Sequence, residues 1–338
     1  MTDLVLFHSM EDVGAAANQM ASENVFADFQ SRKAKNSLVR QRNDLAVFQT
    51  YLLSVGVEAE NLFSNPSAWH GITWGIVKGF VSYMVLQGYA LSSVNHRLTT
   101  VRSYATLANQ ARAVSSDELL RIKSVKGYAA KEALKVNEKR IAENIPVRMG
   151  FKKAEATSIS ESQLDNILAM LPDTPQGHRD MLLMLILSEL GLRVGELQAL
   201  ETSNFNLEDG TITFYRQKVN ITQTHRLSMR LWEAAKTYIN QDANGILWRG
   251  SMRSKVDGSK LTDTKMSIRG ISKRIAFFGL KVGVKELSPH DLRHHWTTKA
   301  ARNTSLDNLM QAGGWASYAM PLHYIERHKI ANEGVILS

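Results

Sequence analysis

The first part of the chain alternates apolar and polar positions with a period close to 3.6 residues, which is typical of amphipathic helices. Thr73 is placed to cap one of these helices, and Gly88 is placed to end it. Ser92 or Ser93 can cap the next helix. The pattern predicts an all-helical N-terminal domain with helices over residues 24–55, 74–87, 94–112 and 116–136.

A different pattern begins near residue 158. Ser160 and Gln163 have the spacing of a capping box at a helix start, and the apolar run 181–187 is typical of a buried helix. Two later segments, 210–218 and 224–231, alternate and are rich in Thr, Ile, Phe and Tyr, which predicts a β-hairpin before helices return. The expected fold is mainly α with a small β-sheet, a helical domain followed by an α+β domain.

The chain has 338 residues, which is long for a single core and favours two domains. A basic stretch with Pro146, Gly150 and little apolar pattern is typical of a linker. We expect a weakly ordered N-terminal segment, a helical domain, a basic linker and a second domain with a C-terminal tail, over residues 1–22, 23–138, 139–157 and 158–338.

The formal net charge of +9 and the sequence pI of about 9.6 favour a polyanionic partner, with nucleic acid as the first choice. Arg97 and Arg102 interleave with apolar residues on one predicted helix, and Lys139 and Arg140 begin the basic linker. All four are candidate DNA contacts. A solvated helix face and an exposed hinge explain the same positions without any ligand.

The chain contains no cysteine, which excludes disulfides and thiolate metal sites and fits a cytosolic protein. The N-terminus has no basic region followed by an apolar one, so we expect no signal peptide. The most apolar run is too short to span a bilayer, and no membrane partner is expected. Glycine-rich phosphate loops are also absent from the sequence.

Six residues of the second domain have side chains suited to breaking a phosphodiester without a metal ion. Ser288 and Pro289 predict a helix start that puts His290 and Arg293 on one face, where both can point at one phosphate. The whole set consists of Arg193, Lys218, His290, Arg293, Trp315 and Tyr324.

Taken alone, each of these residues has a simpler explanation. Arg193 lies beside Glu196, and such a pair is most often a helix-surface ion pair of little energy. Lys218 lies in or beside the hairpin turn, where a lysine is usually only solvated, and Arg216 and Arg226 are nearby cations that compete with it.

Two further alternatives concern the last part of the chain. Tyr318 lies six residues before Tyr324 and competes with it as a nucleophile. His290 and His294 have the spacing of a metal pair, but a zinc site needs a third ligand, and Arg293 between them would repel a cation. We therefore expect neither a metal nor a cofactor.

Four segments, in a fixed order, resemble the tyrosine recombinase (phage integrase) family. The nine-residue step from Trp315 to Tyr324 is also the family's interval. The resemblance reaches both predicted domains and implies a core-binding domain followed by a tyrosine recombinase catalytic domain. The segments are LSSVNHRLTTVRSYATLA (91–108), GLRVGEL (191–197), HDLRHHWTT (290–298) and MQAGGWASYAMPLHYIE (310–326).

The resemblance implies a role for each reactive residue. Tyr324 would attack the scissile phosphate and form a 3′-phosphotyrosyl bond, while Arg193 and Arg293 would stabilise the charge on the phosphate. Lys218 would protonate the leaving 5′-oxygen. His290 would assist proton transfer at the tyrosine or hold the phosphate.

The resemblance also implies supporting roles. Trp315 would donate its indole N–H to the phosphate, and Glu196 would orient a neighbouring side chain. Two positions depart from the commonest family pattern, in which histidine stands more often at the place of Trp315 and glycines flank the lysine of the hairpin.

A member of this family is expected to be a site-specific recombinase. It would act as a homotetramer on two double-stranded DNA sites with inverted repeats, pass through a Holliday junction, and be a monomer when free. We expect a bacterial, archaeal or phage-encoded protein in the cytoplasm, at the nucleoid. Type IB topoisomerases and telomere resolvases use the same chemistry, and a non-catalytic DNA-binding relative would keep the fold; the complete set of reactive residues argues against the last.

Overall fold

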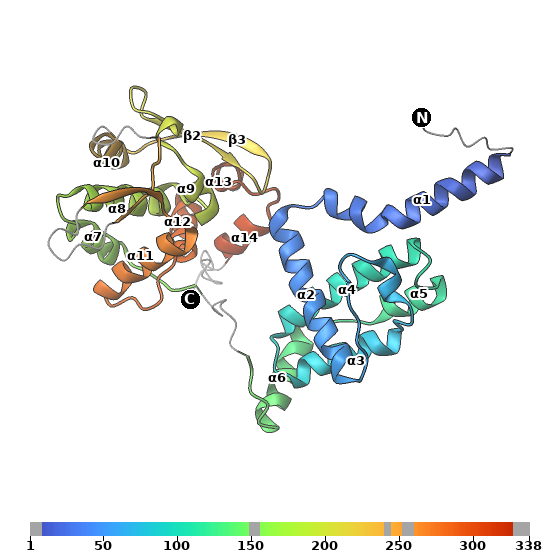
Figure 1. Cartoon of the computed structure of the whole chain (residues 1–338). Helices are drawn as coiled ribbons and strands as arrows, with labels where there is room; N and C mark the ends of the chain where they lie inside the picture. Colours follow the sequence, from blue (N-terminus) through green and yellow to red (C-terminus); the bar gives the residue numbers. More distant parts are fainter. Residues whose placement is uncertain (1–8, 149–155, 240–244, 252–259, 327–338) are drawn as a thin grey trace, which may run out of the picture. The chain divides into compact units, whose positions relative to one another are not determined.

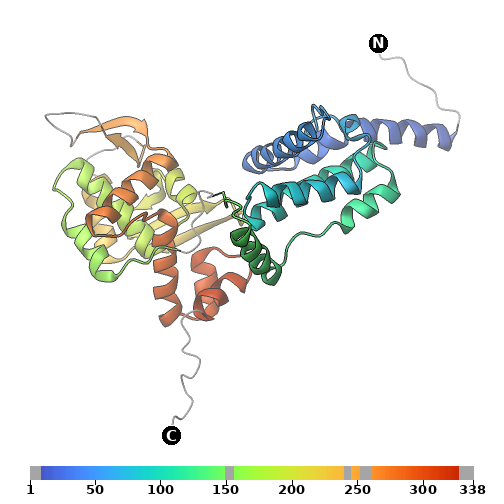
Figure 2. The ribbon, with the colours of Figure 1, turned by 90° about the horizontal axis from the view of Figure 1, so that it is seen from below.

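The computed structural model describes residues 9–148, 156–239, 245–251 and 260–326, with only the backbone described for Ala130 and for residues 323–326. The chain forms two compact units, residues 1–152 and 153–338. Figures 1 and 2 show the helices and strands of both units. The prediction of a mainly α fold with a small β-sheet is confirmed.

The described part of the first unit consists of helices joined by loops. Its helices pack around α4, where Tyr104 meets the ring of Phe26 edge to face at 5.2 Å and stacks on Trp69 at 6.3 Å. The helices are α1 (Met10–Ser31), α2 (Lys35–Ser54), η1 (Pro66–Trp69), α3 (Trp74–Leu86), α4 (Leu91–Gln110), α5 (Ser116–Ser124) and α6 (Ala130–Ala142).

Several helix boundaries of the first unit differ from the sequence prediction. The predicted helix 24–55 is interrupted after Ser31, and its first half extends back to Met10, so residues 10–22 are helical rather than weakly ordered. Good helix formers and the Ser9 cap explain this extension, because only Phe26 of α1 is buried. Helix α4 begins before both candidate serine caps, at buried Leu91.

The predicted helix 116–136 is split in two by a specific contact. The amide of Asn95 donates to the carbonyl of Tyr128 at 2.8 Å and accepts from the N–H of the same residue at 2.8 Å. A Cβ at Gly127 would lie 2.2 Å from Asn95 Oδ1, so the chain can pass only because this residue is glycine. This tertiary contact holds residues 125–129 out of a helix, and the low helix propensity of Val125, Gly127 and Tyr128 acts in the same direction.

The second unit places helices around a three-stranded antiparallel sheet of order β1-β2-β3. The predicted hairpin is confirmed, with Thr213 opposite Thr224, but its second strand spans Ile221–Arg226, and residues 229–231 of the predicted segment are helical. The capping box of Ser160 and Gln163 is also confirmed. The helices are α7 (Glu161–Ala169), α8 (Pro175–Leu185), the π-helical turn η2 (Ile186–Leu190), α9 (Val194–Ala199), η3 (Thr202–Asn204), α10 (Met229–Ile239), α11 (Ile268–Lys281), α12 (Pro289–Asn303), α13 (Leu306–Gly313) and α14 (Ala319–Glu326).

Three short strands of the second unit, β1, β4 and β5, were not predicted. The first sheet consists of β1 (Phe205–Asn206), β2 (Thr211–Arg216) and β3 (Ile221–Arg226), and a separate pair consists of β4 (Arg249–Ser251) and β5 (Leu261–Lys265). Strands β4 and β5 are short and largely polar, so they lack the apolar alternation that reveals a strand in sequence. In the residues that the structure describes, no helix has the length and apolar character needed to cross a membrane.

The predicted linker begins inside a helix of the first unit. Lys139 and Arg140 both belong to α6, where Lys139 is exposed and Arg140 is only 1% exposed. The guanidinium of Arg140 donates to the carbonyls of Val85 at 2.8 Å and Tyr89 at 2.9 Å. This corrects the expectation of an exposed cation, because the side chain of Arg140 fixes α6 to the end of α3.

Arg140→Met is expected to destabilise the first unit by about 1–3 kcal/mol, because two buried carbonyls lose their donor. The neighbouring exposed change Lys139→Met should alter stability by less than about 0.5 kcal/mol. Hydrogen exchange of the α3 and α4 amides in the full chain measures both effects. Equal protection in the two variants would contradict the structural role of Arg140.

Candidate active site

Arg193, the first arginine of the predicted site, follows a sharp turn of the backbone. The π-helical turn η2 continues α8 and ends at Gly191, whose φ of +58° lies in the left-handed region that favours glycine. A Cβ there would lie 2.1 Å from the ring of Trp296, so no larger residue fits. Arg193 follows as the N-cap of α9, and its backbone N–H donates to Oε2 of Glu196 at 2.9 Å.

Glu196 is a buried carboxylate that holds two guanidinium groups. Its Oε1 accepts from Nη1 of Arg193 at 2.7 Å, and its Oε2 accepts from Nη1 of Arg216 at 2.9 Å. A buried carboxylate is costly unless its oxygens are paired in this way. Glu196 is therefore in a position to fix the orientation of Arg193.

Arg293 reaches the same region from α12. It is 5% exposed, and its guanidinium donates to the carbonyl of Gly191 and, at 2.7 Å, to the carbonyl of Gly313. Arg193 donates to the next carbonyl, that of Gly314, at 3.0 Å. These last carbonyls of α13 carry partial negative charge, which attracts both guanidinium groups. The structure thus brings together two arginines that lie a hundred positions apart in the sequence.

Trp315 completes the centre of this cluster. Its ring stacks on Trp296 with 6.3 Å between centroids, and the guanidinium carbon of Arg293 lies 4.8 Å from the ring centroid. A Cβ at Gly313 would lie 1.9 Å from the ring of Trp315, so the glycine makes room for the indole. The two glycines of AGGW are thus required by packing and by backbone conformation, with φ +59° at Gly314.

The other three predicted residues lie on elements next to this cluster. His290 is exposed in the first turn of α12, one turn before buried Arg293. Lys218 is exposed in the turn between β2 and β3. Tyr324 belongs to α14, which packs against α12 and α13, but its side chain is outside the part that the structure describes.

Arg216 is a site residue that the sequence prediction did not include. It is completely buried, and besides Glu196 it donates to Gln223 Oε1 at 2.5 Å and to the Ala312 carbonyl at 2.7 Å. Burial lowers the pKa of Arg216, and the charge of Glu196 acts in the opposite direction. Strand alternation could have revealed it, because Arg216 lies on the same face of β2 as buried Ile212.

Asp291 is a second buried residue that sequence reasoning missed. Its carboxylate accepts from the N–H and hydroxyl of Ser288 at 2.8 and 2.6 Å, and from the N–H of Thr157 at 2.9 Å. The side chain therefore caps α12 and ties the start of the second unit to the helix that carries Arg293. Its place three residues after Ser288, at the N3 position of a capping box, was the signal for a structural role.

The N-terminal candidates are mostly engaged within their own unit. Arg97 lies over the ring of Tyr89 at 4.4 Å and 3.8 Å from the carboxylate of Asp44. Arg102 donates to the carbonyls of Lys123, at 2.8 Å, and Val125, and burial lowers its pKa. Lys139 is thus the exposed member of the four, since Arg140 is buried as well.

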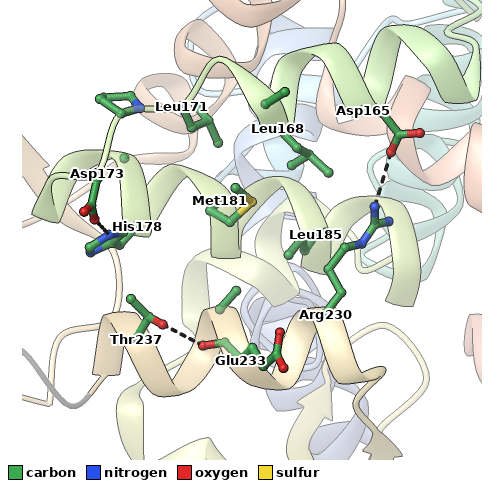
Figure 3. A pocket seen from close by; sticks show the side chains of 14 residues that line it. Asp165, Leu168, Leu171, Asp173, His178, Met181, Leu185, Arg230, Glu233 and Thr237 are labelled. Atoms are coloured by element: carbon green, nitrogen blue, oxygen red, sulfur yellow. Dashed lines mark hydrogen bonds and ion pairs between the residues drawn. The ribbon is translucent and has the colours of Figure 1, made fainter.

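A pocket of about 590 Å³ lies elsewhere in the second unit, between α7, α8 and α10 (Figure 3). Met181 and Leu185 belong to its apolar wall, while Asp165 pairs with Arg230 at 3.3 Å at one end. At the other end Asp173 meets His178 at 2.6 Å. None of the predicted site residues is among the described residues that line this pocket. The arginine cluster is therefore separate from it.

The arginine cluster has the composition of a phosphate site. Arg193, Arg216 and Arg293 lie around the carboxylate of Glu196, and their three positive charges exceed its one negative charge. Guanidinium groups suit the geometry of phosphate oxygens, and a preorganised site lowers the energy of charge that develops in a transition state. Arg193 is 24% exposed, so a substrate can approach it from solvent.

Comparison with known families agrees with this geometry. The sequence model of the phage integrase family matches residues 157–329, just over half of the chain, and covers every residue of the arginine cluster. The chain belongs to the phage integrase family. Its family domain coincides with the second compact unit.

Relatives of this integrase-family chain are tyrosine recombinases. It is 25% identical over 265 residues to tyrosine recombinase XerD of Shewanella oneidensis, covering 78% of this chain and 76% of the relative. It is 25% identical over 220 residues to tyrosine recombinase XerA of Pyrococcus furiosus, covering 65% of this chain and 70% of the relative.

Solved structures of integrases share the fold of this family member. Lambda integrase (75-356), as a dimer bound to a COC′ core site, has a TM-score of 0.58 at 12% identity and covers 93% of this chain and 96% of its own. A lambda integrase tetramer bound to a Holliday junction has a TM-score of 0.57 at 13% identity, with 95% and 83% covered. At this identity the likeness concerns the fold.

The half-buried His225 lies on β3 beneath the cluster, with its ring 5.1 Å from that of Phe214. Burial lowers the pKa of His225 from 6.5 to about 4, and the charge of Arg216 adds to this shift. Between these two pH values the unfolded chain binds a proton that the folded chain excludes. Stability contributed by the neutral ring is thus present above pH 6.5 and is lost as the pH falls toward 4.

We expect His225→Gln to lose less stability than the parent chain as the pH falls from 6.5 to about 4, because glutamine does not titrate. Urea unfolding of both proteins across this window measures the difference, and titrations common to both cancel. Parallel stability curves would show that His225 is not held neutral by the fold.

Proposed function

We propose that this chain is a site-specific DNA recombinase that cuts and rejoins DNA through a tyrosine. The observation that carries the proposal is the convergence of Arg193, Arg293 and Trp315 on the end of α13, next to the helix α14 that contains Tyr324. Membership in the phage integrase family and similarity to tyrosine recombinases support it.

The chemistry is the exchange of one phosphoester bond for another. The hydroxyl oxygen of Tyr324 attacks the phosphorus atom, the bond to the 5′-oxygen breaks, and a 3′-phosphotyrosyl bond and a free 5′-hydroxyl result. Attack by a 5′-hydroxyl on the phosphotyrosine reverses these steps and joins a new pair of strands. The bond energy is retained, so the reaction requires no nucleotide cofactor.

Each side chain of the site has a part in this reaction. Arg193 and Arg293 stabilise the negative charge on the nonbridging oxygens, which is greatest in the transition state. Trp315 donates its indole N–H to the phosphate. Lys218 protonates the leaving 5′-oxygen, and His290 accepts the proton of the tyrosine or holds the phosphate.

The contacts of Tyr318 favour Tyr324 as the nucleophile. The hydroxyl of Tyr318 donates to Asp307 Oδ1 at 2.5 Å, and this bond and the nearby negative charge raise the pKa of Tyr318. A raised pKa makes a tyrosine harder to ionise, whereas a nucleophile requires the opposite. Tyr324 also follows Trp315 at the spacing of the family.

The partner in this proposal is double-stranded DNA. The related lambda integrase is seen as a dimer on a core site and as a tetramer on a Holliday junction. We propose that four copies of this chain likewise act on two duplexes with inverted repeats, and that the free chain is a monomer. The protein would then work in the cytoplasm, at the nucleoid, as expected of a recombinase with bacterial and archaeal relatives.

Tyr324→Phe is expected to abolish covalent capture of a nicked DNA substrate while DNA binding stays within about twofold, because the ring remains and only the nucleophilic oxygen is lost. Tyr318→Phe serves as the matched control and should retain capture. Denaturing gel electrophoresis detects the protein–DNA adduct, and a mobility shift measures binding.

Loss of capture in Tyr318→Phe instead would assign the nucleophile to Tyr318. A strand-exchange assay on paired sites then tests the outcome of the chemistry. Recombinant products support the proposal, whereas relaxation of supercoiled DNA without recombinants would make the protein a topoisomerase.

A further inference from the structure

Arg216 occupies a position that no substrate can reach. It is the last residue of β2, its side chain is 0% exposed, and it immediately precedes the turn that carries Lys218. A cation in such a place is retained only if its hydrogen bonds compensate for the loss of water. Its contacts therefore indicate what it does.

The single guanidinium group of Arg216 joins three elements. Nη1 donates to Glu196 of α9 at 2.9 Å, Nη2 donates to the Ala312 carbonyl at the end of α13 at 2.7 Å, and Nε donates to Gln223 of β3 at 2.5 Å. Gln223 in turn donates to the carbonyl of Gln311 at 2.8 Å. The hairpin, whose strands lie beside α13 in Figure 1, is thus fastened to the end of α13 by two side chains.

The backbone of Arg216 closes the hairpin turn at the same time. Its carbonyl accepts from the N–H groups of Val219 at 3.2 Å and Asn220 at 2.8 Å. The turn around Lys218 is consequently set by the residue whose side chain is tied to Glu196. Arg216 links the turn, the carboxylate that holds Arg193 and the loop before Trp315.

The side chain of Arg216 is closely packed, and a different side chain would not make the same contacts. A Cβ at Gly314 would lie 2.4 Å from Cδ of Arg216, so the glycine loop packs directly on its aliphatic stem. Lysine offers one point charge and cannot make the divergent bonds of a planar guanidinium. Without Arg216, Glu196 has both oxygens available to Arg193, which can then turn away from the Gly314 carbonyl.

We propose that Arg216 is a positioning residue for the recombination chemistry, acting through Glu196 and the end of α13 to hold Arg193 in the geometry that binds the scissile phosphate. The inference rests on the proposed function. Arg216 itself does not touch DNA. It acts through the position of Arg193 and not through protonation of the leaving 5′-oxygen.

Single-turnover cleavage of a nicked DNA substrate tests this role, with Arg216→Lys as the variant and Arg226→Lys, exposed on β3, as the matched control. We expect Arg216→Lys to slow cleavage by about a hundredfold, the size of effect seen when transition-state electrostatics are impaired, with DNA affinity nearly unchanged. The variant should also unfold at a lower temperature, because the buried bonds to Gln223 and Ala312 are lost, so cleavage is measured at a temperature where it remains folded. Arg226→Lys should cleave at the parental rate.

Two further readouts separate positioning from a merely structural effect. In an Arg193→Lys background the Arg216→Lys change should slow cleavage much less, because the group it positions is already lost. In a substrate with sulfur in place of the 5′-oxygen, the leaving atom needs little protonation. This substrate should not restore the rate of Arg216→Lys if the variant loses the correct position of Arg193. Additive losses in the double variant, or full rescue by sulfur, would overturn the proposal.

Gln223→Ala provides the test if Arg216→Lys does not fold. It removes one acceptor of Arg216 and one bond to α13 without a change of charge, and should slow cleavage by roughly fivefold with the same dependence on Arg193. An unchanged rate in Gln223→Ala would also contradict the proposal. If the parental chain forms no covalent DNA adduct at all, the recombinase assignment fails rather than the role of Arg216.

Discussion

The backbone carbonyls that end α13 accept hydrogen bonds from three arginines of three different elements. Arg193 comes from the start of α9, Arg216 from the end of β2, and Arg293 from the second turn of α12. Three guanidinium groups so close together would otherwise repel one another. The partial negative charge of a helix C-terminus is a fixed acceptor that takes no proton, so it holds the cations at any physiological pH. The arrangement of the site depends on this constraint.

Several features of the sequence follow from it. Gly313 and Gly314 bring the carbonyls within reach, because a Cβ at either position would meet Trp315 or Arg216. Gly191 supplies the turn before Arg193 and a further acceptor for Arg293. Glu196 neutralises part of the charge and leaves an excess that favours a phosphodiester. The same side chains therefore stabilise the fold and prepare the site.

Much of this could be predicted from the sequence, because local signals and fixed spacings determine it. The capping box at Ser160 and the hairpin around Lys218 were predicted correctly, and so was the start of α12 at Pro289. The positions that failed depend on tertiary contacts. Asn95 separates α5 from α6 by bonding to Tyr128, and no propensity of residues 116–136 signals that contact.

Burial of charged side chains was the hardest property to predict. Arg140 was expected at the surface of a linker, yet it is buried against the end of α3 because α6 continues through it. The sequence prediction chose Lys218 and did not include Arg216, although the alternation of β2 places Arg216 on the buried face of the strand. Strand alternation can indicate that such a cation is buried, but its partners cannot be recognised from sequence alone, since they come from distant segments.

We propose that this cluster activates a tyrosine of α14 to cut DNA without a metal ion. The most direct measurement is mass spectrometry of peptides from the covalent complex, trapped on nicked DNA with and without a chelator. We expect a nucleotide joined by its 3′-phosphate to the peptide that contains Tyr324, in equal yield under both conditions. An adduct on Tyr318, a 5′-phosphate linkage, or cleavage that requires a divalent metal would contradict it.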